Sequence, residues 1–209
     1  MPEPTAHHRL ATDTDDGMLL VISGPSGVGK TTITRAVERA IPGSVFSVSA
    51  STRQKTAADV EGVDYHFVND AEFDRMVAGG AFLEWAGVFG KKYGTPRAWV
   101  DEQLRRGRLV ILEIDVQGAK QVKAIIPSAF GLFILPPSEA VLLDRLRRRR
   151  RDPEDVIRRR FAEAKWEIDE ARASGAYDEF LVNDDLDATI RRAVEVVQGE
   201  RRRRRGTPA

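Results

Sequence analysis

A short segment near the amino end of the chain limits the possible folds more than any other feature. The apolar run LLVIS at residues 19–23 leads into GPSGVGKT at residues 24–31, and an amphipathic helical pattern follows. The spacing G-x-x-x-x-G-K-[S/T] between a strand and a helix is typical of loops that bind the phosphates of a nucleoside triphosphate. A glycine-rich turn that merely joins two elements has no need of a Lys-Thr pair. The sequence therefore predicts a nucleotide site here.

Each part of this loop has an expected task. Backbone N–H groups and the positive end of the following helix bind phosphate oxygens. We expect Lys30 to bridge the β- and γ-phosphates of ATP and the Thr31 hydroxyl to bind Mg²⁺, the cofactor that accompanies ATP. The predicted ATP-binding residues in this segment are Gly24, Pro25, Ser26, Gly27, Val28, Gly29, Lys30, Thr31 and Thr32.

The rest of the chain indicates the α/β class. Apolar runs at 18–22, 109–114, 131–135 and 179–182 alternate with segments of helical periodicity, as in a parallel sheet covered by helices. Between the first helix and residue 109, the segments VFSVSAS, YHFV and AFLEWAGVFG predict a small inserted β-rich lobe. We expect one domain over 18–198. The two ends, 1–17 and 199–209, are polar or carry charges mainly of one sign, and we expect them to be disordered.

Composition removes several classes of chemistry. The chain of 209 residues has no Cys and three His, which excludes disulfides, thiol nucleophiles and thiolate metal sites. It has no apolar run long enough for a membrane span and no apolar core of a signal peptide, so we expect a cytoplasmic protein without membrane contact. Carboxylates, hydroxyls, Lys, Arg and backbone groups must carry the chemistry.

The charges are unevenly distributed although the net charge is only +1. Nine arginines face three acids between residues 145 and 160, five more follow at 201–205, and the remaining chain is acidic. A general nucleic-acid binder is expected to be basic more broadly. The pattern favours a localised polyanion such as a nucleotide phosphate, and it leaves room for a weak nucleic-acid contact through the arginine tail.

Seven motifs in fixed order carry a resemblance to a known family. The chain resembles guanylate kinases through GPSGVGKTT, VSASTR, GVDYHFV, FLEWAGVFGKKYGTP, LEIDVQG, FILPPS and LVNDDLD, and the similarity covers about residues 18–198. The resemblance implies a P-loop kinase that moves the γ-phosphate of ATP to GMP, and also to dGMP. It implies a GMP-binding lobe over about 49–96 and a helical, arginine-rich lid over about 145–165. The oligomeric state stays open.

Recognition of guanine places clear demands on the acceptor site. The base offers two adjacent donors, N1–H and the 2-amino group, and one acceptor, O6. Glu84, in an otherwise apolar stretch, fits as the acceptor for the two donors. Ser49 and Thr95 fit as hydroxyl donors to O6. Taken alone, Glu84 could equally be a solvated strand residue. The resemblance assigns it to guanine and adds Asp115 as a supporting acid.

The acceptor phosphate and the transfer step need cations and donors. By resemblance, Arg53, Tyr65 and Tyr93 bind the GMP phosphate, although the two tyrosines could instead be core aromatics. No catalytic base is needed, because the second pKa of a phosphate monoester is about 6. The residues expected to act in catalysis are Lys30, Arg53, Arg149 and Arg160, the last two in the lid.

Two further assignments rest on the resemblance. Asn183 matches the position at the adenine edge of ATP, and a turn-forming asparagine is the alternative. Glu113 and Asp115 are candidates for contact with Mg²⁺ through water. The remaining lid arginines fit a solvated helix face equally well.

The chain departs from the family pattern in one important turn. Guanylate kinases usually read T-R-x-P-R-x-G-E there, whereas Thr56 stands here in place of the second arginine and Lys55 in place of the proline. Two alternatives to GMP kinase activity follow: a kinase for another or a modified nucleoside monophosphate, and a catalytically weak binding module. The retained Gly29, Lys30 and Thr31 argue against the binding module.

Overall fold

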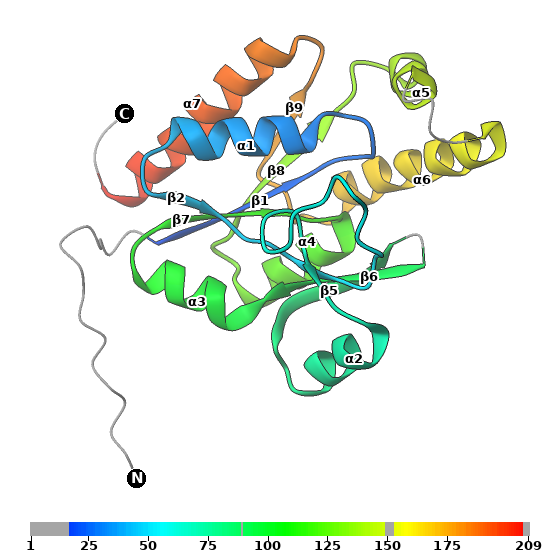
Figure 1. Ribbon diagram of the computed structural model, residues 1–209. Coiled ribbons are helices and arrows are strands. Elements are labelled where there is room, and N and C mark those ends of the chain that lie inside the picture. The colour runs from blue at the N-terminus through cyan, green and yellow to red at the C-terminus, as the bar shows by residue number, and fades with distance from the viewer. Residues whose placement is uncertain (1–16, 89, 149–152, 207–209) are drawn as a thin grey trace.

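A five-stranded parallel sheet forms the centre of the molecule. The computed structural model describes residues 17–88, 90–148 and 153–206, and Figure 1 shows their arrangement. The strands follow one another across the sheet in the order β2-β7-β1-β8-β9. Their bounds are β1 Met18–Ser23, β2 Ser44–Phe46, β7 Leu109–Glu113, β8 Phe130–Leu135 and β9 Glu179–Val182. The predicted α/β class with a parallel core sheet is confirmed.

Helices bury both faces of this sheet. Leu20 and Ile22 of β1 belong to the apolar layer beneath α1 and α7, whereas Leu19 and Val21 belong to the layer against α3, α4 and α6 (Figure 1). Because both faces are covered, the strands read in sequence as continuous apolar runs. The bounds of these helices are α1 Lys30–Ala40, α3 Arg97–Arg105, α4 Val116–Ile125, α6 Glu154–Ala173 and α7 Leu186–Arg204.

The inserted lobe has a sheet of its own, in the order β4-β3-β6-β5. Its small core includes Phe73 and Phe82, whose ring centroids lie 4.6 Å apart. The sequence placed VFSVSAS in this lobe, but Ser44–Phe46 pairs with β7 in the central sheet, and only Ala50–Ser51 lies in the lobe sheet. The lobe elements are β3 Ala50–Ser51, β4 His66–Phe67, α2 Asp70–Ala78, β5 Phe82–Val88 and β6 Lys91–Pro96.

The described part of the predicted lid is helical. It begins in α5 (Glu139–Arg148) and continues in α6, while residues 149–152 lie outside the described part of the chain. Leu142 and Leu146 of α5 pack with Ile157 and Ala164 of α6. These contacts fix the two helices against each other.

The carboxyl-terminal prediction requires a correction. Helix α7 extends to Arg204, so residues 199–204 are helical rather than disordered. The Glu200 carboxylate accepts hydrogen bonds from Arg203 and Arg204, and Arg204 also donates to the Ser128 carbonyl at 2.6 Å. The like charges of the tail are thus partly compensated by a buried acid that the tail itself supplies. Residues 1–16 and 207–209 lie outside the described residues.

Candidate functional site

The phosphate loop lies where β1 ends and α1 begins. Gly29 occupies the N-cap position of α1 with φ 98°, a left-handed conformation that side chains strain. A Cβ on Gly29 would also lie 2.8 Å from the amide nitrogen of Asn183. That amide nitrogen donates to the Val28 carbonyl at 2.7 Å, so Asn183 supports the loop from below. The glycine is therefore required both by the backbone and by the close approach of Asn183.

The Lys30 side chain folds back over the same loop. Its Nζ donates to the carbonyls of Gly24 at 2.5 Å and Pro25 at 3.1 Å. These contacts hold the ammonium against the loop backbone, and its contact with phosphate oxygens stays a prediction.

An oxygen pair beside Lys30 suits a divalent cation. The Thr31 hydroxyl donates to the Glu113 carboxylate at 2.8 Å, which brings the end of β7 next to the start of α1. Mg²⁺ is bound by hard oxygen donors, usually one or two carboxylates together with phosphates and water. Thr31 and Glu113 therefore fit the ion that ATP brings.

The predicted lid contacts the phosphate loop through Arg160 of α6. Its Nη2 donates to the Ser26 hydroxyl at 2.8 Å. Arg145 of α5 donates to the Asn183 carbonyl at 2.9 Å, on the other side of the loop. Arg149, the second predicted lid arginine, lies outside the described residues.

A buried carboxylate lies in the inserted lobe. Glu84 on β5 is only 4 % exposed, and its Oε1 accepts a hydrogen bond of 2.5 Å from the Thr95 hydroxyl on β6. Its other oxygen approaches α4 so closely that a Cβ on Gly118 would lie 2.4 Å from Oε2. Asp115 caps α4 by accepting from the N–H groups of Gln117 and Gly118. The start of α4 therefore forms one wall of the Glu84 site.

Burial makes Glu84 an unusual acid. Burial raises the pKa of the carboxyl group to about 7; the hydrogen bond from Thr95 opposes this rise, and the nearby Asp115 charge contributes to it. A carboxylate in such a place calls for N–H donors from a ligand.

The predicted phosphate-binding side chains lie on one turn and one strand. Tyr65 and Tyr93 have ring centroids 5.6 Å apart, and burial raises the pKa of Tyr65 to about 12. The Arg53 guanidinium lies 5.0 Å from the Tyr65 ring and binds Asp59 through two hydrogen bonds of 2.7 and 3.1 Å. Thr56 donates to the same Asp59 carboxylate from its N–H and its hydroxyl.

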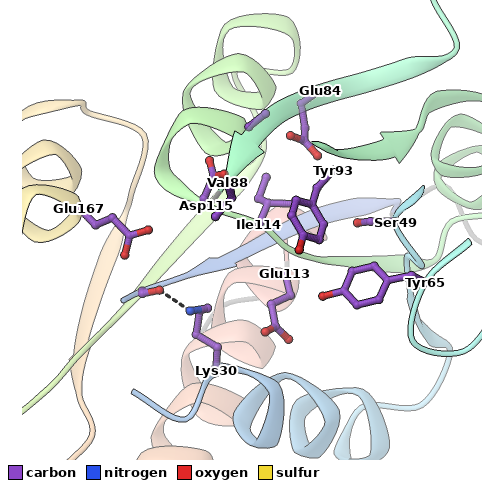
Figure 2. A pocket seen from close by; sticks show the side chains of 12 residues that line it. Lys30, Ser49, Tyr65, Glu84, Val88, Tyr93, Glu113, Ile114, Asp115 and Glu167 are labelled. Carbon is purple, nitrogen blue, oxygen red and sulfur yellow. Dashed lines mark hydrogen bonds between the residues drawn. The ribbon is translucent and has the colours of Figure 1, made fainter. Parts of the chain in front are cut away.

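One cavity of about 240 Å³ joins the two halves of the site. In Figure 2, Glu84, Tyr93, Ser49 and Tyr65 face Lys30 and Glu113 across this space. The lining residues are Gly24, Lys30, Ser49, Tyr65, Glu84, Ala86, Val88, Tyr93, Glu113, Ile114, Asp115 and Glu167.

Comparison with known proteins shows the family of the chain. The family model described as guanylate kinase matches residues 16–200. The chain belongs to the guanylate kinase family. It is 49% identical over 191 residues to the guanylate kinase of Anaeromyxobacter dehalogenans, with 91% of this chain and 84% of that protein covered. The guanylate kinase of Carboxydothermus hydrogenoformans is 44% identical over 185 residues, with 88% and 89% covered.

A solved structure supports the same family assignment. The crystal structure of guanylate kinase from Anaplasma phagocytophilum shares 32% identity with this chain and a TM-score of 0.71, and the match covers 91% of this chain and 89% of that one. Among the described residues, no helix is both long and apolar enough to cross a bilayer. The cytoplasmic location and the weak nucleic-acid contact stay predictions.

Most of the site residues predicted from the sequence of this guanylate kinase family member line one of two neighbouring cavities. Ser49, Tyr65, Glu84, Tyr93 and Asp115 line the cavity with Gly24 and Lys30. A neighbouring cavity of about 250 Å³ is lined by Ser26, Gly27, Gly29, Lys30, Thr31, Thr32 and Glu113. Thr95 reaches the first cavity through Glu84.

Arg53 and Asn183 stand apart from these groups. Arg53 is directed to Asp59, and Asn183 contacts the phosphate loop rather than an open pocket. Their contacts with GMP phosphate and adenine stay predictions.

Three residues of the site were missed by the sequence reasoning. Glu167 of α6 lines the cavity, and burial raises its pKa to about 7 despite the opposing charge of Lys30. Gly118 lets Glu84 approach α4, and Asp59 holds Arg53. Gly118 lies inside the quoted motif LEIDVQG, which was the available signal; Glu167 sits among ordinary helix-surface acids and gave none.

Proposed function

We propose that this chain transfers the γ-phosphoryl group of ATP to GMP, and also to dGMP, giving ADP and GDP or dGDP in a Mg²⁺-dependent reaction. One observation carries the proposal: the buried Glu84 carboxylate and the Lys30 ammonium line the same cavity. The first is suited to a base with two adjacent N–H donors, and the second to phosphates. The cavity therefore suits an acceptor whose base is guanine and whose phosphate faces the donor loop.

Guanine selection follows from the pairing of donors and acceptors. Ionised Glu84 would accept from N1–H and the 2-amino group. The Ser49 hydroxyl would donate to O6, or Thr95 would do so after giving up its hydrogen bond to Glu84. Adenine would turn its N1 acceptor toward the carboxylate and leave a buried charge unpaired. Such a mismatch gives strong discrimination because buried polar groups lose their partners.

The transfer itself needs positioning and charge neutralisation. An oxygen of the GMP phosphate attacks the γ-phosphorus, and the bond from the γ-phosphorus to the β,γ-bridging oxygen breaks, so that ADP leaves with the electron pair. The attacking oxygen is already largely deprotonated at neutral pH, and no side chain has to remove a proton. Lys30 would leave the Gly24 and Pro25 carbonyls for phosphate oxygens, and Arg160 would act from its place beside Ser26.

The metal would be held at the Thr31 end of the loop. Thr31 would bind Mg²⁺ directly, and Glu113 or Asp115 would bind through water. The ion would supply positive charge against the developing charge on the transferred group. In the unliganded protein, Glu113 keeps the Thr31 hydroxyl oriented.

Release of ADP from ATP and Mg²⁺ in the presence of GMP, dGMP, AMP, CMP or UMP tests the proposal. We expect turnover with GMP and dGMP at least about 100-fold above turnover with the other three. Lys30→Met is the control, and it should lower turnover by about 100-fold or more in a folded protein. If another monophosphate is preferred, GMP is not the main acceptor and the proposal is wrong on this point. If none of the five gives turnover, a binding module is favoured.

A further inference from the structure

Arg35 connects the nucleotide-binding core to the acceptor lobe. It lies on α1, little more than one helical turn after Lys30 and Thr31. Its Nη2 donates a hydrogen bond of 3.0 Å to the backbone carbonyl of Val63, in the turn between β3 and β4. The Val63 side chain is exposed, so this turn is not held down by apolar burial at that point. The hydrogen bond from Arg35 therefore links this turn of the lobe to α1.

The Arg35 guanidinium is fixed before it reaches the lobe. It stacks on the Phe46 ring at 3.8 Å from the centroid, and its Nη1 binds the Glu38 carboxylate at 3.0 Å. The other oxygen of Glu38 accepts from the Phe46 N–H at 3.2 Å, which closes the network. A planar guanidinium held on two sides presents its remaining N–H groups in one direction, so little side-chain freedom is lost when Val63 is bound.

The turn that receives this hydrogen bond is internally stiff. The Asp64 carboxylate accepts from the Val60 N–H at 2.8 Å, and the Gly62 N–H donates to the Tyr65 carbonyl at 2.9 Å. Asp59 precedes this turn and holds Arg53, while Tyr65 ends it and lines the cavity. A shift at Val63 is therefore expected to move the predicted phosphate-binding groups of the lobe.

We propose that Arg35 is a positioning residue for phosphoryl transfer. It sets the separation between the acceptor phosphate, held by Arg53 and Tyr65, and the donor phosphates, held by Lys30 on the same helix as Arg35. This inference rests on the function proposed above. In-line transfer requires the reacting atoms to lie about 3 to 3.5 Å apart, so a link between the two phosphate sites affects both acceptor binding and turnover.

Steady-state kinetics of Arg35→Ala, Arg35→Lys and Arg39→Ala test the proposal. Arg35→Ala should raise the KM for GMP about 10-fold and lower kcat, with the KM for ATP unchanged within about 2-fold. Arg35→Lys keeps the charge near Phe46 and should recover part of the loss. Arg39 is exposed on the same helix, and Arg39→Ala is expected to match the wild type.

The readouts separate this role from a purely structural one. A general loss of stability would change the kinetics with ATP and GMP together and lower the melting temperature, whereas a lost link should act on GMP. If Arg35→Ala fails to fold, Glu38→Gln keeps the guanidinium and frees it, and should raise the KM for GMP alone.

Two results would go against the proposal. An unchanged KM for GMP in folded Arg35→Ala overturns the role of Arg35, and so does an equal rise in the KM values of GMP and ATP. A wild type without GMP-dependent ADP release would instead contradict the proposed function, which keeps the two failures distinct.

Discussion

The Asp59 carboxylate binds the Arg53 guanidinium end-on, with Oδ1 to Nη2 at 2.7 Å and Oδ2 to Nη1 at 3.1 Å. Arg53 and Thr56 hold the pKa of Asp59 well below its usual range through these hydrogen bonds, so the acid stays ionised. Thr56 stands where the family pattern has a second arginine, and its hydroxyl serves the same carboxylate. The turn is thus organised around one arginine instead of two.

This arrangement predicts the effect of restoring the family residue. Thr56→Arg adds a forked, charged donor beside the predicted phosphate site, in place of one neutral hydroxyl. We expect the KM for GMP to fall about 10-fold, with the KM for ATP little changed, in steady-state assays of both proteins. If the variant uses GMP less well while the wild type phosphorylates another monophosphate efficiently, the turn is shaped for a different acceptor.

Acid should weaken GMP binding through Glu84. GMP needs the ionised carboxylate, and burial holds the pKa of Glu84 at about 7 in the unliganded protein. Protonation therefore competes with GMP as pH falls below about 7, and the dissociation constant should rise toward 10-fold per pH unit. Calorimetric titration from pH 8.5 to pH 5.5 measures this dependence.

The control for pH must account for the ligand and for a second acid. The GMP phosphate also titrates near pH 6, so Glu84→Gln, which keeps that titration, supplies the baseline. Glu167 has a pKa of about 7 in the same cavity, and Glu167→Gln should retain the wild-type dependence. If the pH dependence of the GMP dissociation constant disappears in Glu167→Gln and persists in Glu84→Gln, the effect belongs to Glu167 and the prediction for Glu84 is wrong.

The carboxyl-terminal arginines should contribute to stability. Glu200 has a side chain only 8% exposed and is paired with Arg203 and Arg204. Deletion of 201–209 removes both partners and should lower the free energy of unfolding by about 1 kcal/mol or more, measured by chemical denaturation. Activity at 25 °C should persist, because the tail lies away from the cavity.

Single substitutions refine the tail experiment. Arg204→Ala loses its hydrogen bonds to Glu200 and the Ser128 carbonyl. Arg202→Ala is the control, because Arg202 is exposed on the same helix turn. Only Arg204→Ala is expected to be destabilised. Equal stability of the two variants and the wild type would show that the tail arginines are solvated and do not stabilise the fold.

The fold was predictable where one local signal dominated. The run LLVIS, the phosphate loop and the helix after it read correctly because strand, loop and helix each have a strong sequence pattern. The short strand at Ser44–Phe46 was assigned to the wrong sheet, since a three-residue strand does not reveal which neighbour it pairs with. Helix α2 was not predicted, although Asn69 caps it by accepting from the Glu72 N–H at 2.8 Å.

The site was predictable in residue types and less so in pairings. Glu84 was singled out as an acid in an apolar stretch, and Thr95 was predicted as a donor to guanine O6, but the hydrogen bond that joins Thr95 to Glu84 was not predicted. The pairing of Arg53 with Asp59 depends on how the turn at 53–59 folds, which no periodicity encodes. The helical tail was not predicted, because five like charges suggest solvation, while the acid that compensates them lies one residue earlier.

Glu84→Gln tests the central claim most directly, since it keeps the shape of the side chain and replaces one acceptor oxygen by a donor. The KM values for GMP and ATP should be measured on the wild type and on this variant, with melting temperatures to confirm folding. We predict that the KM for GMP rises about 100-fold while the KM for ATP stays within about 2-fold, because only guanine loses its ionic partner. Equal changes in both KM values, or none in either, would contradict guanine recognition by Glu84.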